Sequence, residues 1–326
     1  MNKVRTRSVT GERSFMKAER TLSYPIHETL TVREYLFTHG YSRRLLSHLK
    51  TTDSSILCNA VPVHTDHLMR EGDVLTIRLS EDPSLFPPFP ARENPRPFRV
   101  IFEDEDILVA DKSAHLPVHS SLKYPDLTMA GAVCEYCARQ GRPIVYRCIN
   151  RLDLETTGLL LIARHMLSGC VLSSALKEHR IRRRYVAIVQ GKLQGPGVVD
   201  APIARLPGSS IRRCVSFQEG RKAVTHYLPL SYDPVKDLTL TALQLETGRT
   251  HQIRIHMQFI GHPLIGDYLY YPDFRYIKRQ ALHSQYLSFI HPVTGEPLSF
   301  SCPLPDDMQR LFPGFSCSSL TAGSLS

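Results

Sequence analysis

The stretch Ile149-Asn-Arg-Leu-Asp-Leu-Glu-Thr-Thr-Gly158 runs directly into Leu159-Leu-Leu-Ile-Ala163. The five apolar residues have the length of a buried strand. The polar turn before them places Asp153 at the edge of a core, where partial desolvation makes a carboxylate more nucleophilic if a cation keeps it ionised. The same residues also fit an ordinary turn aspartate that caps its own backbone. Asp153 is therefore a candidate catalytic residue, and it needs a cationic partner.

A second segment, residues 245–256, reads LETGRTHQIRIH. It predicts a helix from His251 to Ile260, with Thr247 or Thr250 available as the N-terminal cap. Arg254 lies between two isoleucines within this helix, so we expect it to be partly buried. Because a buried guanidinium needs a carboxylate partner, we expect Arg254 to pair with an acid.

Metal chemistry is not indicated by the histidines and cysteines. His251 and His256 are five residues apart and therefore lie on different faces of the predicted helix. Cys134 and Cys137 form one C-x-x-C, but a second ligand pair at comparable spacing is missing.

Arg249 precedes the helix, where the dipole disfavours a cation, so we expect it to bind an anion from the protein or from a ligand phosphate.

A third segment, residues 179–191, reads HRIRRRYVAIVQG. Nucleic-acid-binding proteins combine cations, which contact phosphates, with aromatic rings, which stack on bases or sugars. Tyr185 with Arg183 and Arg184 fits that pattern. A solvated helix end followed by a core tyrosine is the alternative interpretation.

The composition favours a polyanionic partner. The chain has 326 residues, a formal net charge of +9 and a pI near 9.2, although a merely basic surface gives the same numbers. The eight cysteines are scattered, which is typical of reduced thiols. No apolar run approaches the roughly 18 residues that cross a bilayer, so we expect a cytoplasmic protein. Residues 1–23 predict a flexible basic N-terminus, with an organellar targeting peptide as the alternative.

Six prolines between residues 83 and 97 predict a stiff linker over 81–97. This linker separates a module at 24–80 from a larger domain at 98–313, and residues 314–326 predict a flexible tail. Strands dominate the larger domain and βαβ repeats are few, so we predict an α+β fold with a mixed, mainly antiparallel sheet. The predicted elements there include strands at 159–163, 185–189 and 238–245 and helices at 167–179 and 251–260.

The module at 24–80 shows two helix signals. Thr31 and Glu34 have the spacing of a capping box, and Ser42 can cap a second helix over residues 43–50. The leucines of the second helix face inward in this prediction. Its outward charges are candidate RNA contacts, with simple solvation as the alternative: Arg43, Arg44 and Lys50.

Taken together, the segments resemble the RluA-type family of pseudouridine synthases. Residues 150–164 look like that family's catalytic motif, residues 183–191 its tyrosine motif, and residues 246–267 its closing arginine motif. Residues 103–119 are similar to its opening strands. The resemblance covers the chain from about Phe98 to Phe312, and residues 24–80 are similar to the αL-type RNA-binding module that often precedes this catalytic domain.

The resemblance implies a cofactor-free isomerase that converts uridine to pseudouridine in RNA. Asp153 would attack the sugar C1′ or act through a glycal intermediate, with Arg254 as its ion-pair partner. Tyr185 would pack on the target base and would also be available to remove a proton. Arg151 would fill the space left by the flipped uridine. Further substrate-binding residues under this resemblance are Thr157, Arg249, His251, Arg183 and Arg184.

Four residues depart from the family pattern. Asn150 stands where histidine is usual, Thr157 where serine is usual, and Ser113 and His115 replace a proline and a glycine. None of them touches the three predicted catalytic residues, so the expectation of activity stands. Because the opening motif is altered, an unusual substrate and a weakened enzyme both remain open as interpretations.

Two other functions fit parts of the sequence. One is a non-catalytic RNA-binding or ribosome-assembly factor on the same scaffold. The other is a glycosidase that uses Asp153 and Glu155, although residues two apart on an extended segment point to opposite faces. Ribosomal and transfer RNA both remain open as substrates, and we expect a monomer without a metal or membrane partner.

Overall fold

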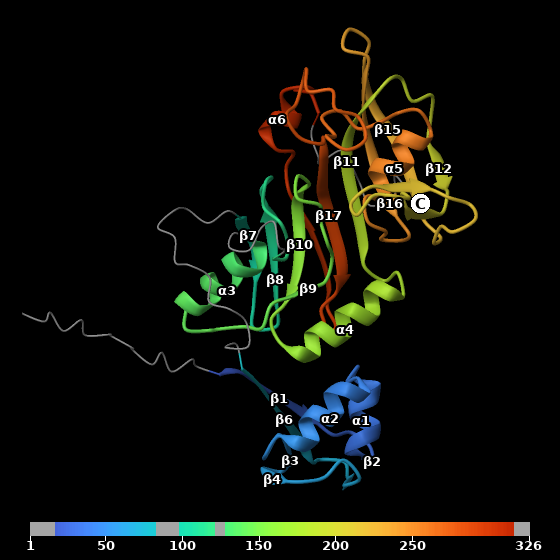
Figure 1. Cartoon of the computed structure of the whole chain (residues 1–326). Helices are drawn as coiled ribbons and strands as arrows, with labels where there is room; N and C mark the ends of the chain where they lie inside the picture. The colour runs from blue at the N-terminus through green and yellow to red at the C-terminus, as the bar shows by residue number, and fades with distance from the viewer. Residues whose placement is uncertain (1–16, 83–97, 121–127, 316–326) are drawn as a thin grey trace, which may run out of the picture.

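The computed structural model describes residues 17–82, 98–120 and 128–315. These residues form a small N-terminal module and a larger α+β body, and helix α4 (Met166–Lys177) lies at the side of the body that faces the module in Figure 1. Residues 1–16 of the expected tail at 1–23, residues 83–97 of the expected linker at 81–97 and residues 316–326 of the expected tail at 314–326 lie outside the described residues.

The N-terminal module starts earlier than the sequence predicted. Strand β1 pairs with β6 along its whole length, from Ala18 opposite Glu81 to Pro25 opposite Val74, so the expected boundary at residue 24 is wrong. One sheet has the order β1-β6-β3-β4, and β2 pairs with β5. The strands are β1 (Ala18–Pro25), β2 (Leu30–Thr31), β3 (Ile56–Cys58), β4 (Val61–Pro62), β5 (Leu68–Met69) and β6 (Val74–Glu81).

The two helices of the module form as predicted. Helix α1 (Val32–Thr38) begins with the full capping box between Thr31 and Glu34. Helix α2 (Arg43–Thr51) begins at Ser42, whose hydroxyl accepts a hydrogen bond from the Leu45 amide. The α2 leucines are buried, while its basic side chains Arg43, Arg44 and Lys50 are exposed.

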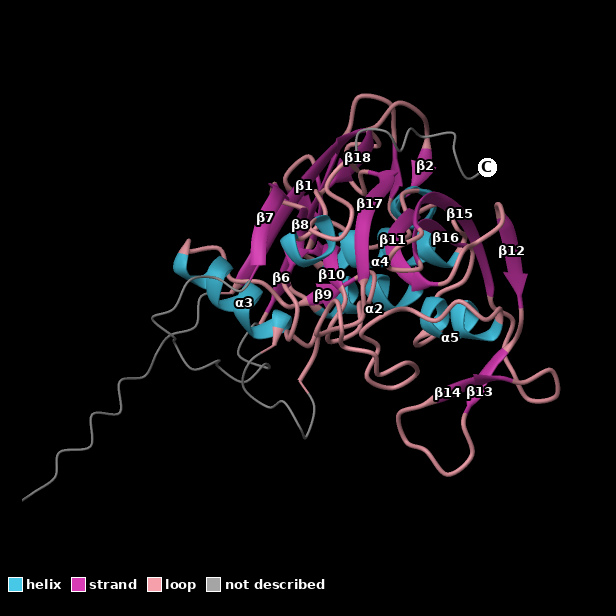
Figure 2. Cartoon of the chain, turned by 90° about the horizontal axis from the view of Figure 1, so that it is seen from above, coloured by secondary structure: helices cyan, strands magenta, loops and turns pink. Residues whose placement is uncertain are grey.

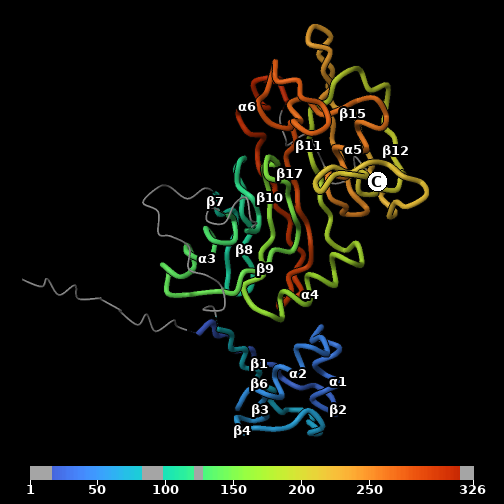
Figure 3. The backbone as a smooth tube through the Cα atoms, in the orientation of Figure 1, coloured from blue at the N-terminus to red at the C-terminus, as the bar shows by residue number. Residues whose placement is uncertain are grey.

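The body is built on one ten-stranded sheet with the order β12-β15-β16-β11-β17-β10-β8-β7. The β10–β17 pair is parallel and the other pairs are antiparallel, which confirms the predicted mixed sheet. Figure 3 shows the late strand β17 running between β11 and β10. Two further strands join the sheet outside this order, since β18 pairs with β17 and β9 pairs with β10. The strands are β7 (Phe98–Glu103), β8 (Ile107–Lys112), β9 (Arg147–Cys148), β10 (Thr157–Ala163), β11 (Arg182–Gln190), β12 (Gly197–Asp200), β15 (Val224–Asp233), β16 (Leu238–Leu245), β17 (Leu282–Ile290) and β18 (Pro297–Ser301).

Both faces of the central strands are buried. In β10, Leu160 packs in the cluster that includes helix α3 (Met129–Arg139), whereas Leu159 and Leu161 pack in the cluster that includes α4. Covering the sheet on both sides explains why this strand reads as a continuous apolar run rather than an alternating one.

Helix α5 (Gln252–Phe259) lies beside the hairpin of β13 (Ile203–Arg205) and β14 (Arg213–Val215), which projects from the body in Figure 2. The predicted threonine caps are wrong. His251 occupies the N-cap position with φ +59° and makes no side-chain cap. Thr247 instead donates to the Gln252 side chain, which ties the preceding turn to the helix.

The module and the body share a packed interface. Leu167 of α4 belongs to the hydrophobic cluster of the module, and Glu81 of β6 forms an ion pair with Arg147 of β9. Arg20 of β1 donates to Asp106 at 2.8 Å. Arg20 also forms an ion pair with Glu105, so the module is fixed to the body through α4 and three ion pairs. The short helix α6 (Asp306–Gln309) ends the described fold, in which no helix is long and apolar enough to span a membrane.

Candidate active site

The predicted contact between Asp153 and Arg254 is present. Asp153 lies in the loop between β9 and β10, and Arg254 projects from α5, 101 residues further along the chain. The Arg254 Nη1 donates to the Asp153 Oδ2 at 2.9 Å. The two sequence motifs thus meet at one point.

Arg254 has a second carboxylate partner that the sequence reasoning missed. Its Nε and Nη2 donate to the two oxygens of Asp267, each at 2.7 Å, and both side chains are 1% exposed. Asp267 also accepts hydrogen bonds from the backbone amides of Leu269 and Tyr270, which fix it in its turn. Asp267 is the last residue of the closing motif, and this position was the available signal. A fully buried guanidinium can require a second carboxylate partner.

The surroundings of Asp153 favour its charged form. Burial alone would raise the pKa of Asp153, but the electrostatic effect of the His251 imidazole and the positive charges of Arg254 and Arg151 outweigh it and hold the pKa below its usual range. The carboxylate remains 25% exposed, so a substrate has access to it. An ionised, accessible acid is what nucleophilic catalysis requires.

Asp153 opens onto a basic cleft of about 590 Å³. Five of its lining residues are Arg or Lys, and Asp153 and Glu246 are its acids. Because Glu246 is hydrogen-bonded to His226 at 2.6 Å, its charge is partly engaged elsewhere. The five basic residues are Arg151, Lys177, Arg183, Lys222 and Arg249.

Tyr185 lies on β11 and lines the same cleft, with only 4% of its surface exposed. Burial raises the pKa of Tyr185, although Arg183 partly offsets this, so the phenol is neutral at physiological pH. The ring thus presents an uncharged face beside Asp153. Arg151 is exposed at the cleft wall.

The other predicted substrate-binding residues divide into two groups. Arg249 and His251 line the pocket around Asp153, with His251 Nε2 3.9 Å from the Asp153 Oδ2. Thr157 is buried in β10 and hydrogen-bonded to His283 at 2.8 Å, so the structure does not bring it to the cleft. Arg184 also faces away, because it donates to Gln244 and lies over the Tyr286 ring.

The loop that carries Asp153 is tied to β10 by Asn150, one of the departures from the family pattern. The Asn150 side chain donates to the Leu159 carbonyl at 3.0 Å and accepts from the Leu161 amide at 2.8 Å. At the other end of the loop, Gly158 has φ +104°, and an added Cβ would stand 2.3 Å from the Ser284 carbonyl oxygen. Only glycine fits there.

A buried lysine that the sequence reasoning missed supports the same loop. Lys112 is fully buried, and its Nζ donates to three carbonyls, those of Ser113, Leu116 and Leu154, each at 2.9 Å. Burial favours the neutral amine, whereas the carbonyls and the nearby carboxylates favour the ammonium. Burial prevails and lowers the pKa of Lys112 to about 7.

The geometry does not favour a glycosidase pair. Glu155 binds His115 at 2.9 Å, whereas Asp153 binds Arg254, so the two carboxylates have separate partners. His115 itself has φ +59°, in keeping with a position where the family usually has glycine. These two acids do not form the facing pair that such a reaction needs.

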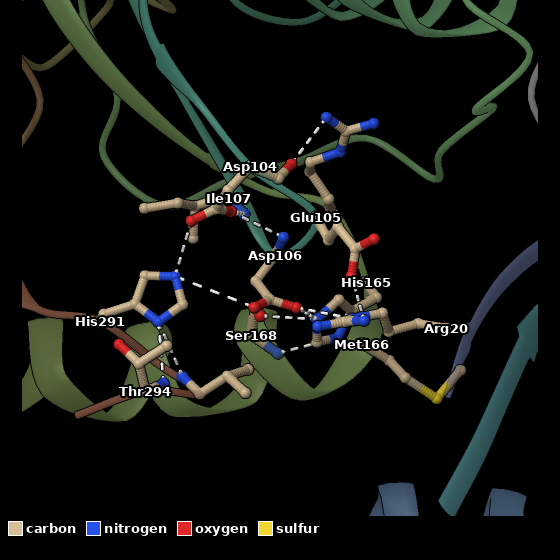
Figure 4. A network of polar contacts seen from close by, with 12 residues as sticks. Arg20, Asp104, Glu105, Asp106, Ile107, His165, Met166, Ser168, His291 and Thr294 are labelled. Atoms are coloured by element: carbon tan, nitrogen blue, oxygen red, sulfur yellow. Dashed lines mark hydrogen bonds and ion pairs between the residues drawn. The ribbon is translucent and has the colours of Figure 1, made fainter. Parts of the chain in front are cut away.

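One group of potential metal ligands, Asp104, Asp106 and His291, lies near the module interface. Figure 4 shows that protein donors already engage its carboxylates. Asp106 accepts from Arg20 and contacts His165 at 2.9 Å, and Asp104 contacts His291 at 2.9 Å. This network joins the module to the body. Because protein side chains already bind the carboxylates of Asp104 and Asp106, these acids do not need a metal ion as a partner.

The α+β sheet and an accessible acid in a basic cleft fit an enzyme that acts on nucleic acid. Residues 106–259 match the family model described as RNA pseudouridylate synthase. A relative in Bacillus subtilis (strain 168), named "Uncharacterized RNA pseudouridine synthase YjbO", is 41% identical over 87% of this chain and 99% of its own length. The chain therefore belongs to the RNA pseudouridine synthase family and isomerises uridine to pseudouridine in RNA.

Other comparisons agree. The "Ribosomal large subunit pseudouridine synthase D" of Zymomonas mobilis is 39% identical over 69% of this chain and 75% of its own length. The solved structure of "Human RNA Pseudouridylate Synthase Domain Containing 1" shares the fold, with a TM-score of 0.53 and 24% identity over 66% of this chain and 86% of that one. The curated relatives favour the enzyme over the non-catalytic RNA-binding factor.

Proposed function

We propose that Asp153 is the catalytic carboxylate of this pseudouridine synthase and that the substrate is ribosomal RNA. The observation that supports the first part is the Asp153–Arg254–Asp267 arrangement at the floor of the basic cleft. The second part is supported by relatives named for the large ribosomal subunit, which are 37–39% identical to this chain. Transfer RNA is the alternative substrate.

The reaction breaks the bond between N1 of uracil and C1′ of ribose and forms a bond between C5 and C1′. The hydrogen on C5 leaves as a proton and N1 gains one, so the reaction needs no oxidant or co-substrate. Asp153 acts either by attack on C1′ or through a glycal. Both routes need the carboxylate ionised, and Arg254 keeps it so and holds it in place.

Tyr185 and Arg151 handle the flipped nucleotide in this proposal. Extrusion of a base costs a few kcal/mol, which contacts inside the enzyme must offset. Tyr185 packs on the uracil, and its neutral phenol favours this role over proton removal. Arg151, exposed at the cleft wall, fills the space that the base leaves.

Further substrate contacts come from the cleft and from the module. Arg249, His251 and Arg183 contact the RNA strand near Asp153. The module acts as an αL-type RNA-binding unit through the exposed side chains of Arg43, Arg44 and Lys50 on α2. The enzyme works as a cytoplasmic monomer without a cofactor.

Mapping of pseudouridines tests this proposal. Ribosomal and transfer RNA from cells that lack the gene are compared with RNA from cells complemented by the wild-type protein or by Asp153→Asn. We expect at least one site in large-subunit RNA to disappear, and only the wild-type protein to restore it. Restoration by Asp153→Asn would refute the catalytic role of Asp153, and a loss confined to transfer RNA would refute the ribosomal substrate.

A further inference from the structure

We propose that Arg183 binds a backbone phosphodiester of the substrate strand beside the target uridine. Arg183 lies on β11, two residues before Tyr185, and its side chain lines the same cleft. The inference rests on the proposed function only in taking RNA as the occupant of that cleft. What it adds is the chemical group bound and the residue that binds it.

Arg183 is buried without a compensating anion. Only 8% of it is exposed, its Nε has no hydrogen-bond partner, and no ion pair links it to a carboxylate within the described residues. Three other buried arginines each meet a carboxylate, namely Arg164, Arg254 and Arg279. An unpaired buried guanidinium costs stability, which is understandable if a ligand anion completes the site.

The guanidinium faces the turn that precedes α5. A Cβ added to Gly248 would lie 3.4 Å from Nη1 of Arg183 and 3.8 Å from its Nη2. The same turn carries Arg249, whose Nε donates to the Lys222 backbone carbonyl at 2.9 Å. Arg183, Lys222 and Arg249 all line the cleft.

The ligand chemistry follows from this arrangement. A guanidinium has parallel N–H donors that match two oxygens of one phosphate, and neighbouring lysine and arginine side chains add charge. The nearest cleft acids are engaged, since Asp153 binds Arg254 and Glu246 binds His226. An RNA strand whose base packs on Tyr185 carries a phosphodiester on each side of that nucleotide, within reach of Arg183.

Binding of a single-stranded oligouridylate about 12 nucleotides long, measured over a series of KCl concentrations, tests the inference. Arg183→Gln should weaken binding by about tenfold and reduce the slope of log affinity against log salt by about 0.7, the value for one phosphate that is no longer neutralised on a single strand. Arg182→Gln removes the same charge from the exposed neighbour on β11 and should leave the slope near that of the wild type.

Thermal unfolding separates a binding role from a structural one. Without RNA, Arg183→Gln should raise the midpoint or leave it unchanged, because it removes an unpaired buried charge. Oligouridylate should then raise the midpoint of the wild type by more than that of the variant. A variant with a lower midpoint and an unchanged salt slope would overturn the inference. Arg183→Lys keeps the charge and should keep the slope.

These measurements involve no turnover, so the inference and the proposed function fail separately. A smaller salt slope in Arg183→Gln supports the phosphate site even if pseudouridine mapping fails. On a mapped substrate, a neutral methylphosphonate at one linkage beside the target should weaken binding by the wild type but not by Arg183→Gln. Equal losses for both proteins at every linkage would overturn the assignment to that phosphodiester.

Discussion

Arg254 holds Asp153 through one hydrogen bond of 2.9 Å from Nη1, while its Nε and Nη2 bind Asp267 through two bonds of 2.7 Å. One guanidinium therefore serves two carboxylates, and the trio keeps a net negative charge. Asp267 fixes Arg254, and Arg254 in turn positions Asp153. The Asp153 carboxylate is thus oriented by a cation without being fully neutralised by it.

Asp267→Asn should lower both stability and turnover. The change leaves Arg254 with one charged partner, and breaking a buried ion pair costs about 3 kcal/mol or more. We expect a reduced unfolding free energy in urea and a lower kcat, with RNA affinity nearly unchanged because Asp267 is buried away from the cleft.

Glu178→Gln is the matched control, since it removes a carboxylate from an exposed ion pair with Arg180. Exposed pairs contribute little, so both stability and kcat should stay near wild type. An Asp267→Asn enzyme with wild-type kcat would show that Arg254 does not need its second partner.

The proposed contribution of the module to RNA binding can be measured by charge removal on α2. The triple variant Arg43→Gln, Arg44→Gln, Lys50→Gln should weaken ribosomal RNA binding and reduce the salt slope by about 0.7 for each phosphate that these side chains neutralise in the wild type. Burial of the α2 leucines is untouched, so the fold should be retained.

A control triple variant changes Arg99, Arg139 and Lys236 to glutamine, which removes three charges that already have carboxylate partners. Its salt slope should match that of the wild type. If the two triple variants behave alike, net charge rather than the α2 surface attracts the RNA.

Lys112 makes the stability of the protein depend on pH. Its folded pKa of about 7 lies below its unfolded value of 10.5, so the unfolded chain binds more protons between these values. Stability must therefore rise with pH across this window, by about 2 kcal/mol between pH 7 and pH 9 from this group.

The check is urea unfolding at both pH values for the wild type and for Lys112→Met, which has no charge to titrate. The stability difference between the two proteins should shift by that amount in favour of the wild type at pH 9. Parallel pH dependences would mean that Lys112 stays charged in the fold, held by its three carbonyls.

Asn150→Asp tests how the loop that carries Asp153 is held. An aspartate accepts from the Leu161 amide as Asn150 does, but its second oxygen would face the Leu159 carbonyl. Losing a buried hydrogen bond costs about 1–3 kcal/mol. We expect kcat to fall with little change in KM, whereas Asn150→Gln, which keeps both polar groups, should retain more activity. A raised KM with an unchanged kcat would instead assign Asn150 to substrate binding.

Much of the site was predictable because its charges need partners. The buried position of Arg254 demanded a carboxylate, and the family resemblance indicated that this carboxylate is Asp153. Asp267 was missed because its contact depends on the turn after α5, which no periodicity reveals. The choice of Arg184 was avoidable: strand residues alternate between faces, so Arg183 and Arg184 could not both reach the cleft.

The fold was predictable where patterns were regular. Strand β10 is buried on both faces, so its sequence is a continuous apolar run that predicts a strand. In the module, the N-cap residues of α1 and α2 predicted where these helices begin. Strand β1 was missed because its exposed face carries charges such as Glu19 and it reads as a polar tail. Strand β15 contains Pro229 at a register shift, which broke its pattern.

The most direct test of the whole account is single-turnover release of tritium from RNA labelled at C5 of uridine, with Asp153→Asn compared to the wild type. The wild type should release one tritium for each uridine converted, and Asp153→Asn should release none while binding the RNA within a few fold of wild-type affinity. Tritium release by Asp153→Asn at a rate comparable to the wild type would contradict the account.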